Sequence, residues 1–134
     1  MSFGNATETD ILNLLMIGTA LSWNAATQLD IHLHTADPGE AGISTTNEAT
    51  YTGYAVVTVN RSAADWTVTG NQAVNDNLIQ FVVCSGGSNT ITHASITPAG
   101  STQIIAYHAL GVSLPVVAGI QPQFGAGTLT LTLD

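Results

Sequence analysis

The sequence predicts an all-β protein, a jelly-roll-like β-sandwich of about eight short strands with one N-terminal helix. Two observations support this fold class. Apolar and polar residues alternate along several short segments, as they do where a strand buries one face. Turn-forming glycine, proline and asparagine separate these segments about every 8–12 residues. Residues 1–134 are expected to form a single domain, since neither a linker nor an internal repeat divides them.

The clearest alternation lies in residues 29–34, where one face is leucine and isoleucine and the other carries Asp30, His32 and His34. A period of two is typical of a half-buried strand. The strand is expected to end at the turn Asp37-Pro38-Gly39. There proline presets φ, glycine accepts a positive φ, and the aspartate side chain can bond the backbone ahead of it.

Seven further segments complete the predicted strands. The last of them alternates three leucines with three threonines, so its leucines are expected to point inward. A polar loop is expected at residues 41–50, a flexible connection at 85–89 and a turn at 116–119. The predicted strands are residues 51–59, 66–69, 78–84, 89–96, 103–110, 120–124 and 128–133.

The helix is expected within residues 1–22. Thr7 offers a hydroxyl N-cap, and Glu8 and Asp10 then lie in the first turn, where carboxylates interact favourably with the helix dipole. Apolar residues follow at positions 11, 14, 15 and 21, and Gly18 weakens the far end. We expect this apolar stripe to pack on a sheet or on a partner subunit.

The charge balance excludes several classes of partner. The chain has one strong cation, Arg61, against nine carboxylates, and its formal net charge is −8. Nucleic-acid binding and docking to an anionic membrane both need several Lys or Arg. No run approaches the ~20 apolar residues of a membrane span, and the N-terminus lacks the basic start of a signal peptide. Synthesis in the cytoplasm is expected.

The low charge content also bears on assembly. Charged residues make up 7% of the chain, against roughly a quarter in an ordinary soluble domain. Much of the surface is therefore expected to be buried against other chains, although an outer face of Thr, Asn and Ser would also stay soluble.

Asp30, His32 and His34 are the strongest candidates for metal chemistry, because His-x-His is a real ligand spacing. Cupins, which are jelly rolls, use such a pair with a carboxylate a few residues later. Here Glu40 follows, but the intervening turn would aim it elsewhere. The second cupin segment is incomplete, because no histidine follows Pro98-Ala99-Gly100 within seven residues. We expect hydrogen-bonded or interface histidines, with a cupin-like metal enzyme as the remote alternative.

No other pattern indicates catalysis. His93 and His108 lie on neighbouring predicted strands and could pair, but no acidic partner is near them. Cys84 follows apolar residues and is expected to be an inert, buried thiol without a disulfide partner. The chain has no nucleophile elbow and no phosphate-binding glycine loop. The sequence therefore predicts no catalytic residue, no cofactor and no metal, and a protein that is not an enzyme.

The segment Leu33 to Glu40, which reads Leu-His-Thr-Ala-Asp-Pro-Gly-Glu, resembles the hallmark of a family of small tailed-bacteriophage virion proteins, often labelled tail fibre proteins. The resemblance continues through Gly53-Tyr54-Ala55 and Thr90 to His93, and ends with the segment 127–133. Relatives usually have an arginine directly after the Tyr-Ala, where this chain has Val56. A charged contact made there cannot be carried over, although Arg61 could take a similar part.

Relatives of this size are also similar to jelly-roll cementing proteins that decorate the capsids of short-tailed phages. The resemblance implies a capsid-surface protein that binds the major capsid protein and bridges capsid subunits. It also allows self-association as a homodimer or trimer. A tail or tail-fibre component, including a receptor-binding module, is the alternative. The expected contact residues are Trp23, Tyr51, Tyr54, Arg61 and Trp66, because aromatic residues dominate interface hot spots, although each could equally belong to the core.

Overall fold

The computed structural model describes residues 1–133 and contains one helix and ten strands. All strand pairs are antiparallel. The predicted all-β class with a single N-terminal helix is therefore confirmed. The elements are β1 (Ser2–Phe3), α1 (Asn5–Ile17), β2 (Gln28–His34), β3 (Val57–Asn60), β4 (Trp66–Thr69), β5 (Gln72–Asn75), β6 (Ile79–Gln80), β7 (Ser88–Pro98), β8 (Ala106–Val117), β9 (Gln123–Phe124) and β10 (Thr130–Thr132).

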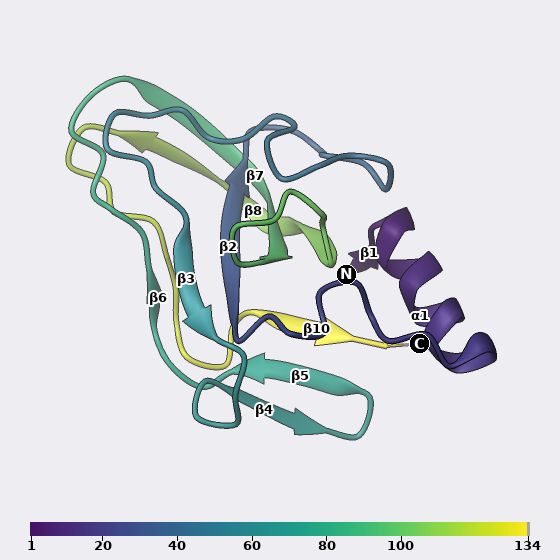
Figure 1. The fold of residues 1–134 in the computed structure, drawn as a ribbon. Coiled ribbons are helices and arrows are strands. Elements are labelled where there is room, and N and C mark those ends of the chain that lie inside the picture. Colours follow the sequence, from purple (N-terminus) through teal and green to yellow (C-terminus); the bar gives the residue numbers. More distant parts are fainter. Residues whose placement is uncertain (134) are drawn as a thin grey trace.

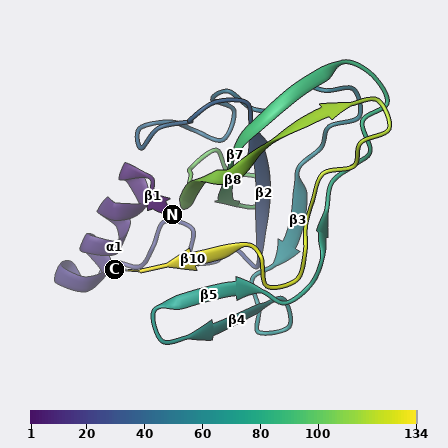
Figure 2. The ribbon, with the colours of Figure 1, turned by 180° about the vertical axis from the view of Figure 1, so that it is seen from behind.

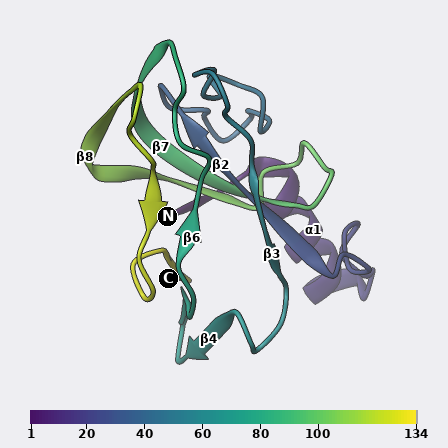
Figure 3. The ribbon, with the colours of Figure 1, turned by 90° about the vertical axis from the view of Figure 1, so that its left-hand side faces the viewer.

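The strands form three sheets. A five-stranded main sheet has the order β1-β8-β7-β2-β3, a three-stranded sheet has the order β10-β5-β4, and β6 pairs with β9. Figure 1 shows the three-stranded sheet below the main sheet and α1 at one end of the molecule, and Figure 2 shows the same arrangement from behind. From the side, β6 lies in front of β2 and β7 (Figure 3). The ten strands thus form sheets of five, three and two strands.

The core is apolar and contains an aromatic row. Phe81, which is 1% exposed, stacks on Tyr54 with ring centroids 6.4 Å apart and meets the edge of Phe124 at 6.2 Å. Ile31 and Leu33 of β2 belong to the same buried cluster. The segment that contains β6 thus closes over the apolar face of the main sheet, as the alternation in β2 predicts.

The prediction that β2 is half-buried is wrong, because residues 30–34 are all buried, on both faces of the strand. The polar loop after the turn covers the second face. It is attached by backbone bonds from Ala49 N to Leu33 O and from Thr35 N to Asn47 O, both 2.8 Å long. The tight turn itself is confirmed: Gly39 has φ 74°, and its N–H donates to Asp37 Oδ1 at 2.8 Å.

The helix begins two residues before the predicted cap. Gly4 occupies the N-cap position, and the Thr7 hydroxyl instead donates to Ile104 O at 2.9 Å, so Thr7 ties the helix to the chain before β8. Gly18 ends the helix in the left-handed conformation, which leaves Leu21 outside it. No helix within residues 1–133 is long and apolar enough to cross a bilayer.

Four predicted strands are shorter in the structure, and two of them, 120–124 and 128–133, are reduced to β9 and β10. The predicted strand 51–59 is reduced to β3, because Gly53 has φ 96° and a turn bond joins Tyr54 N to Tyr51 O. The predicted strand 78–84 is reduced to β6. Alternation in the sequence cannot show whether a segment has a partner strand. In the segments before β3 and after β6, the neighbouring backbone supplies only isolated bonds.

Other predicted boundaries also move. Two strands, β1 and β5, were not predicted, and β5 pairs with β4 through the turn Gly70-Asn71. β8 begins at Ala106 and continues through Val117, beyond the predicted end at residue 110 and into the predicted turn 116–119. In the predicted last strand, residues 128–133, Leu129 is buried as expected. Leu133 is 52% exposed, so the prediction that it points inward is wrong.

Candidate functional site

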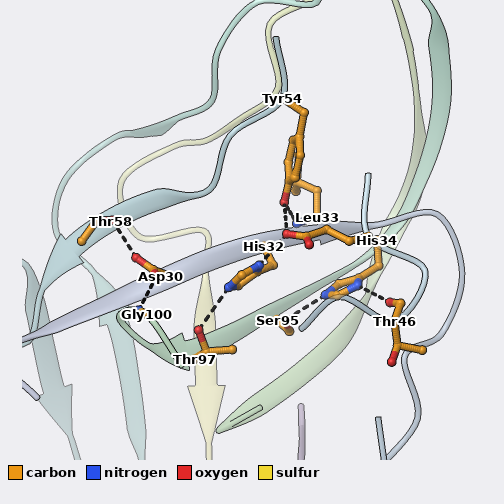
Figure 4. A network of polar contacts seen from close by, with 11 residues as sticks. Asp30, His32, Leu33, His34, Thr46, Tyr54, Thr58, Ser95, Thr97 and Gly100 are labelled. Atoms are coloured by element: carbon orange, nitrogen blue, oxygen red, sulfur yellow. Dashed lines mark hydrogen bonds and ion pairs between the residues drawn. The ribbon is translucent and has the colours of Figure 1, made fainter. Parts of the chain in front are cut away.

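The histidine pair of β2 is held by protein hydrogen bonds (Figure 4). His34 is fully buried, and its Nδ1 and Nε2 lie 2.8 Å from Thr46 O and 2.8 Å from Ser95 Oγ. A carbonyl can only accept, so Nδ1 carries the proton and Nε2 accepts from the Ser95 hydroxyl. Burial lowers the pKa of the His34 imidazole. The ring is therefore kept neutral and bonded on both sides.

His32 is part of a second network. Its Nδ1 lies 2.7 Å from Glu48 Oε1, and its Nε2 lies 3.1 Å from Thr97 Oγ1. The same Glu48 oxygen accepts from the Tyr54 hydroxyl at 3.0 Å, and that hydroxyl accepts from Leu33 N at 3.1 Å. Burial raises the pKa of Tyr54 strongly, so the phenol keeps its proton. The network joins the polar loop to β2.

Asp30, His32 and His34 do not converge on a common point. The Asp30 carboxylate accepts from Thr58 Oγ1 at 2.6 Å and from Gly100 N at 2.9 Å, away from the histidine partners. Each of the three side chains thus has partners of its own, as expected for hydrogen-bonded residues of a sheet. Within residues 1–133, no three His, Cys, Asp or Glu side chains are grouped to hold a metal ion.

The carboxylate that bonds His32 is Glu48, whereas Glu40 is exposed. Glu48 was not predicted as a site residue, because it lies in a loop without periodicity. His93 stands opposite His34 in the register of β2 and β7, while His108 stands opposite Ala94. His93 is half-buried and shares the face of His34, whereas His108 is exposed and shares the face of Ala94, so it does not extend the histidine row.

A second site is an apolar groove between the main sheet and the three-stranded sheet. We call it the tryptophan groove, and its volume is about 580 Å³. A smaller hollow of about 330 Å³ shares several of its walls and continues toward α1. The groove collects the two tryptophans and the single arginine of the chain. Its principal lining residues are Trp23, Leu29, Arg61, Ala63, Trp66 and Val68.

Contacts with residues of the loop before β2 orient the Arg61 side chain. Its Cζ lies 4.9 Å from the centroid of the Trp23 ring, and its Nη1 donates to Asn24 O at 3.2 Å and to Ala26 O at 3.1 Å. Among residues 1–133 no carboxylate forms an ion pair with it, since the one ion pair there joins His32 to Glu48. The guanidinium is thus positioned while its Nε and Nη2 donors have no acceptor in that part of the chain.

The tryptophans differ in how their indole N–H groups are used. Trp66 Nε1 donates to Asn60 O at 3.1 Å. Trp23 Nε1 is buried and is the one buried side-chain polar atom of the described chain without a hydrogen-bond partner. Trp23, which lines the groove beside Arg61, therefore has an unsatisfied indole donor.

The five predicted contact residues fall into two groups. Trp23, Arg61 and Trp66 share the tryptophan groove. Tyr51 is 3% exposed and donates its hydroxyl to Val82 O at 3.0 Å, which leaves it no surface to offer a partner, and Tyr54 lies in the histidine network. The role of the groove residues in contacts stays a prediction.

The apolar face of α1 is uncovered. The predicted packing of the helix on a sheet does not occur, because Thr7 alone is buried within it. The most exposed side chains of this helix face are Leu12 at 61%, Leu15 at 71%, Met16 at 80% and Ile17 at 72%. Clustered apolar exposure of this kind marks surfaces that bind other proteins.

Comparison with protein families gives one assignment. A family model described as podophage GP4 fiber I protein gp80 matches residues 2–132. The chain belongs to the Gp80 family. This membership makes the chain a structural virion protein of short-tailed phages, which agrees with the resemblance seen in the sequence. A comparison with curated proteins gives no match.

Proposed function

We propose that this Gp80 protein is an attachment subunit of the phage particle, which works by binding neighbouring virion proteins and not by catalysis. The observation that carries the proposal is the apolar surface made by the α1 face and the tryptophan groove. Aromatic residues and arginine dominate the energetics of protein interfaces. Copies that bind weakly at many equivalent places would together hold firmly.

The family description favours a fiber position, in which the protein would connect a fiber to the tail or present it to the host. A capsid position is the second candidate. It is favoured by a sequence without fibrous repeats and by a compact fold with uncovered apolar surface at one end. In that position Gp80 would cement the shell by bridging copies of the major capsid protein. Self-association as a dimer or trimer is compatible with both positions.

The test is to image particles assembled without Gp80, before and after adding the purified protein. Ordered new density on the tail supports the fiber position. Density at capsomer boundaries together with a raised capsid melting temperature supports the cement position. Particles that bind no Gp80 at either place would contradict the attachment proposal.

Two valine variants make this test specific. Val68 lines the groove on β4 and is 72% exposed, whereas Val112 lies outside the groove on β8 and is 84% exposed. Val68→Asp is expected to reduce binding, because it places a charge in an apolar contact. Val112→Asp, a matched change on an exposed strand, is expected to bind as the wild type does.

A further inference from the structure

We propose that the tryptophan groove holds an apolar segment of a neighbouring virion protein whose carboxylate pairs with Arg61. This inference rests on the proposed attachment function and specifies its partner. It is carried by three properties of the groove: its apolar walls, its donor-only polar edge, and its charge within an acidic chain.

The walls indicate an apolar occupant. Most of the lining is apolar or aromatic, including Leu29, Trp66 and Val68, and its volume of about 580 Å³ lies within the usual range of about 300–1,000 Å³ for binding sites. Trp66 is oriented by its bond to Asn60 O, so its ring is already in place. A rigid aromatic wall loses little conformational freedom on binding.

The polar edge of the groove indicates an acceptor. Arg61 has unused donors on Nε and Nη2 within the described chain, and these lie on one edge of the planar guanidinium. That edge matches the two oxygens of a carboxylate. Trp23 Nε1 adds a buried donor without a partner, so a small ring movement that gave it an acceptor would relieve an unfavourable state.

The charge distribution selects a different protein over a second copy. Two copies of this chain would each bring a net charge of −8, and each has Arg61 as its single strong cation. Copies therefore repel one another apart from contacts at this residue. A partner that is less acidic overall, with one carboxylate among apolar side chains, complements the groove without that repulsion.

The experiment uses a photo-crosslinking residue, p-benzoylphenylalanine, in Gp80 made during infection. Ala63 lines the groove, and the neighbouring Ala64, which is equally an exposed alanine, does not. Purified particles are irradiated, and the crosslinked peptides are identified by mass spectrometry. An immunoblot of the same particles first shows whether Gp80 is present, and its absence would overturn the attachment proposal itself.

The groove proposal predicts crosslinks from position 63 to an apolar segment of another virion protein that contains Asp or Glu. Position 64 should give few crosslinks. Arg61→Glu should lower the crosslink yield about tenfold, which corresponds to about 1.4 kcal/mol. Val68→Asp should lower it as well, and this variant leaves untouched the bonds from Arg61 to the loop before β2. Val112→Asp should not change the yield.

Three results would overturn the groove proposal while leaving attachment intact. Position 63 could crosslink to another copy of Gp80, or to a segment without a carboxylate. Positions 63 and 64 could give equal yields. Finally, the yield could be unchanged in both Arg61→Glu and Val68→Asp, with thermal unfolding showing that both variants fold.

Discussion

Lowering the pH from 7.5 to 5.5 is expected to destabilise the protein through His34. The imidazole is fully buried, and both of its nitrogens have protein partners. Burial lowers the His34 pKa below its usual value of 6.5, and the nearby His32 and His93 lower it further, against the opposing effects of Thr46 O and Glu48. The unfolded chain therefore takes up a proton near pH 6.5, whereas the folded chain takes it up only at a lower pH.

The sign and size follow from proton linkage. Stability is fully present above pH 6.5 and is lost as the pH falls from there toward the lower pKa of the folded state, because the unfolded state binds more protons in that range. The upper limit is given by a histidine with an unfolded pKa of about 6.5 that stays neutral in the folded state. Between pH 7.5 and 5.5, such a histidine lowers the free energy of unfolding by about 1.4 kcal/mol. That is a substantial part of a typical total of about 5–15 kcal/mol.

The assay is urea unfolding at pH 7.5, 6.5 and 5.5, followed by tryptophan fluorescence. His34→Asn retains a donor for Thr46 O but cannot titrate, so its stability should vary less over this range, although it is lower at pH 7.5. His108→Gln serves as the comparison, because desolvation and the N-terminal charge lower the pKa of His108 as well. If His34→Asn keeps the full wild-type pH dependence, the reasoning is refuted.

Other substitutions test the packing of the core and of the polar loop. Phe81→Ala should lower the free energy of unfolding by roughly 3–5 kcal/mol, measured by urea unfolding, because the ring is buried and contacts two other aromatic rings; a loss below about 1 kcal/mol would contradict this packing. Tyr54→Phe should lower it by roughly 1–3 kcal/mol and speed amide hydrogen exchange in β2, since the hydroxyl bonds both Glu48 and the strand; unchanged exchange would argue against the network. Gly42→Ala should destabilise by roughly 1–3 kcal/mol in thermal unfolding, because its methyl group would clash with a carbonyl of the preceding turn. Gly111→Ala, which enters open space, should change stability by less than about 0.5 kcal/mol, and equal effects at the two glycines would contradict the turn geometry.

Much of the fold could be read from local patterns. The strand at β2 and the turn Asp37-Pro38-Gly39 follow from alternation and turn chemistry, which act within a few residues. Strand lengths could not be predicted as well. β3 and β6 are short because the extended segments around them lack continuous partners, and β8 is long because β7 lies beside it for most of its length.

The candidate sites depended on contacts between distant parts of the chain. Alternation indicated that His32 and His34 share a face, but it could not show that a loop would cover that face or that Glu48 would meet His32. In the same way, Trp23 and Arg61 were separate candidates in the sequence, and the fold places the guanidinium over the indole ring.

The sequence by itself determined the β class, the single helix, the position of the tight turn and the acidic balance with one arginine. These properties depend on composition and on interactions between near neighbours. Only the tertiary structure decided which faces are covered, which carboxylate bonds His32, and that both tryptophans meet Arg61 in one groove. The physical reason is that side-chain periodicity specifies the two faces of a strand, whereas long-range packing decides what lies against each face.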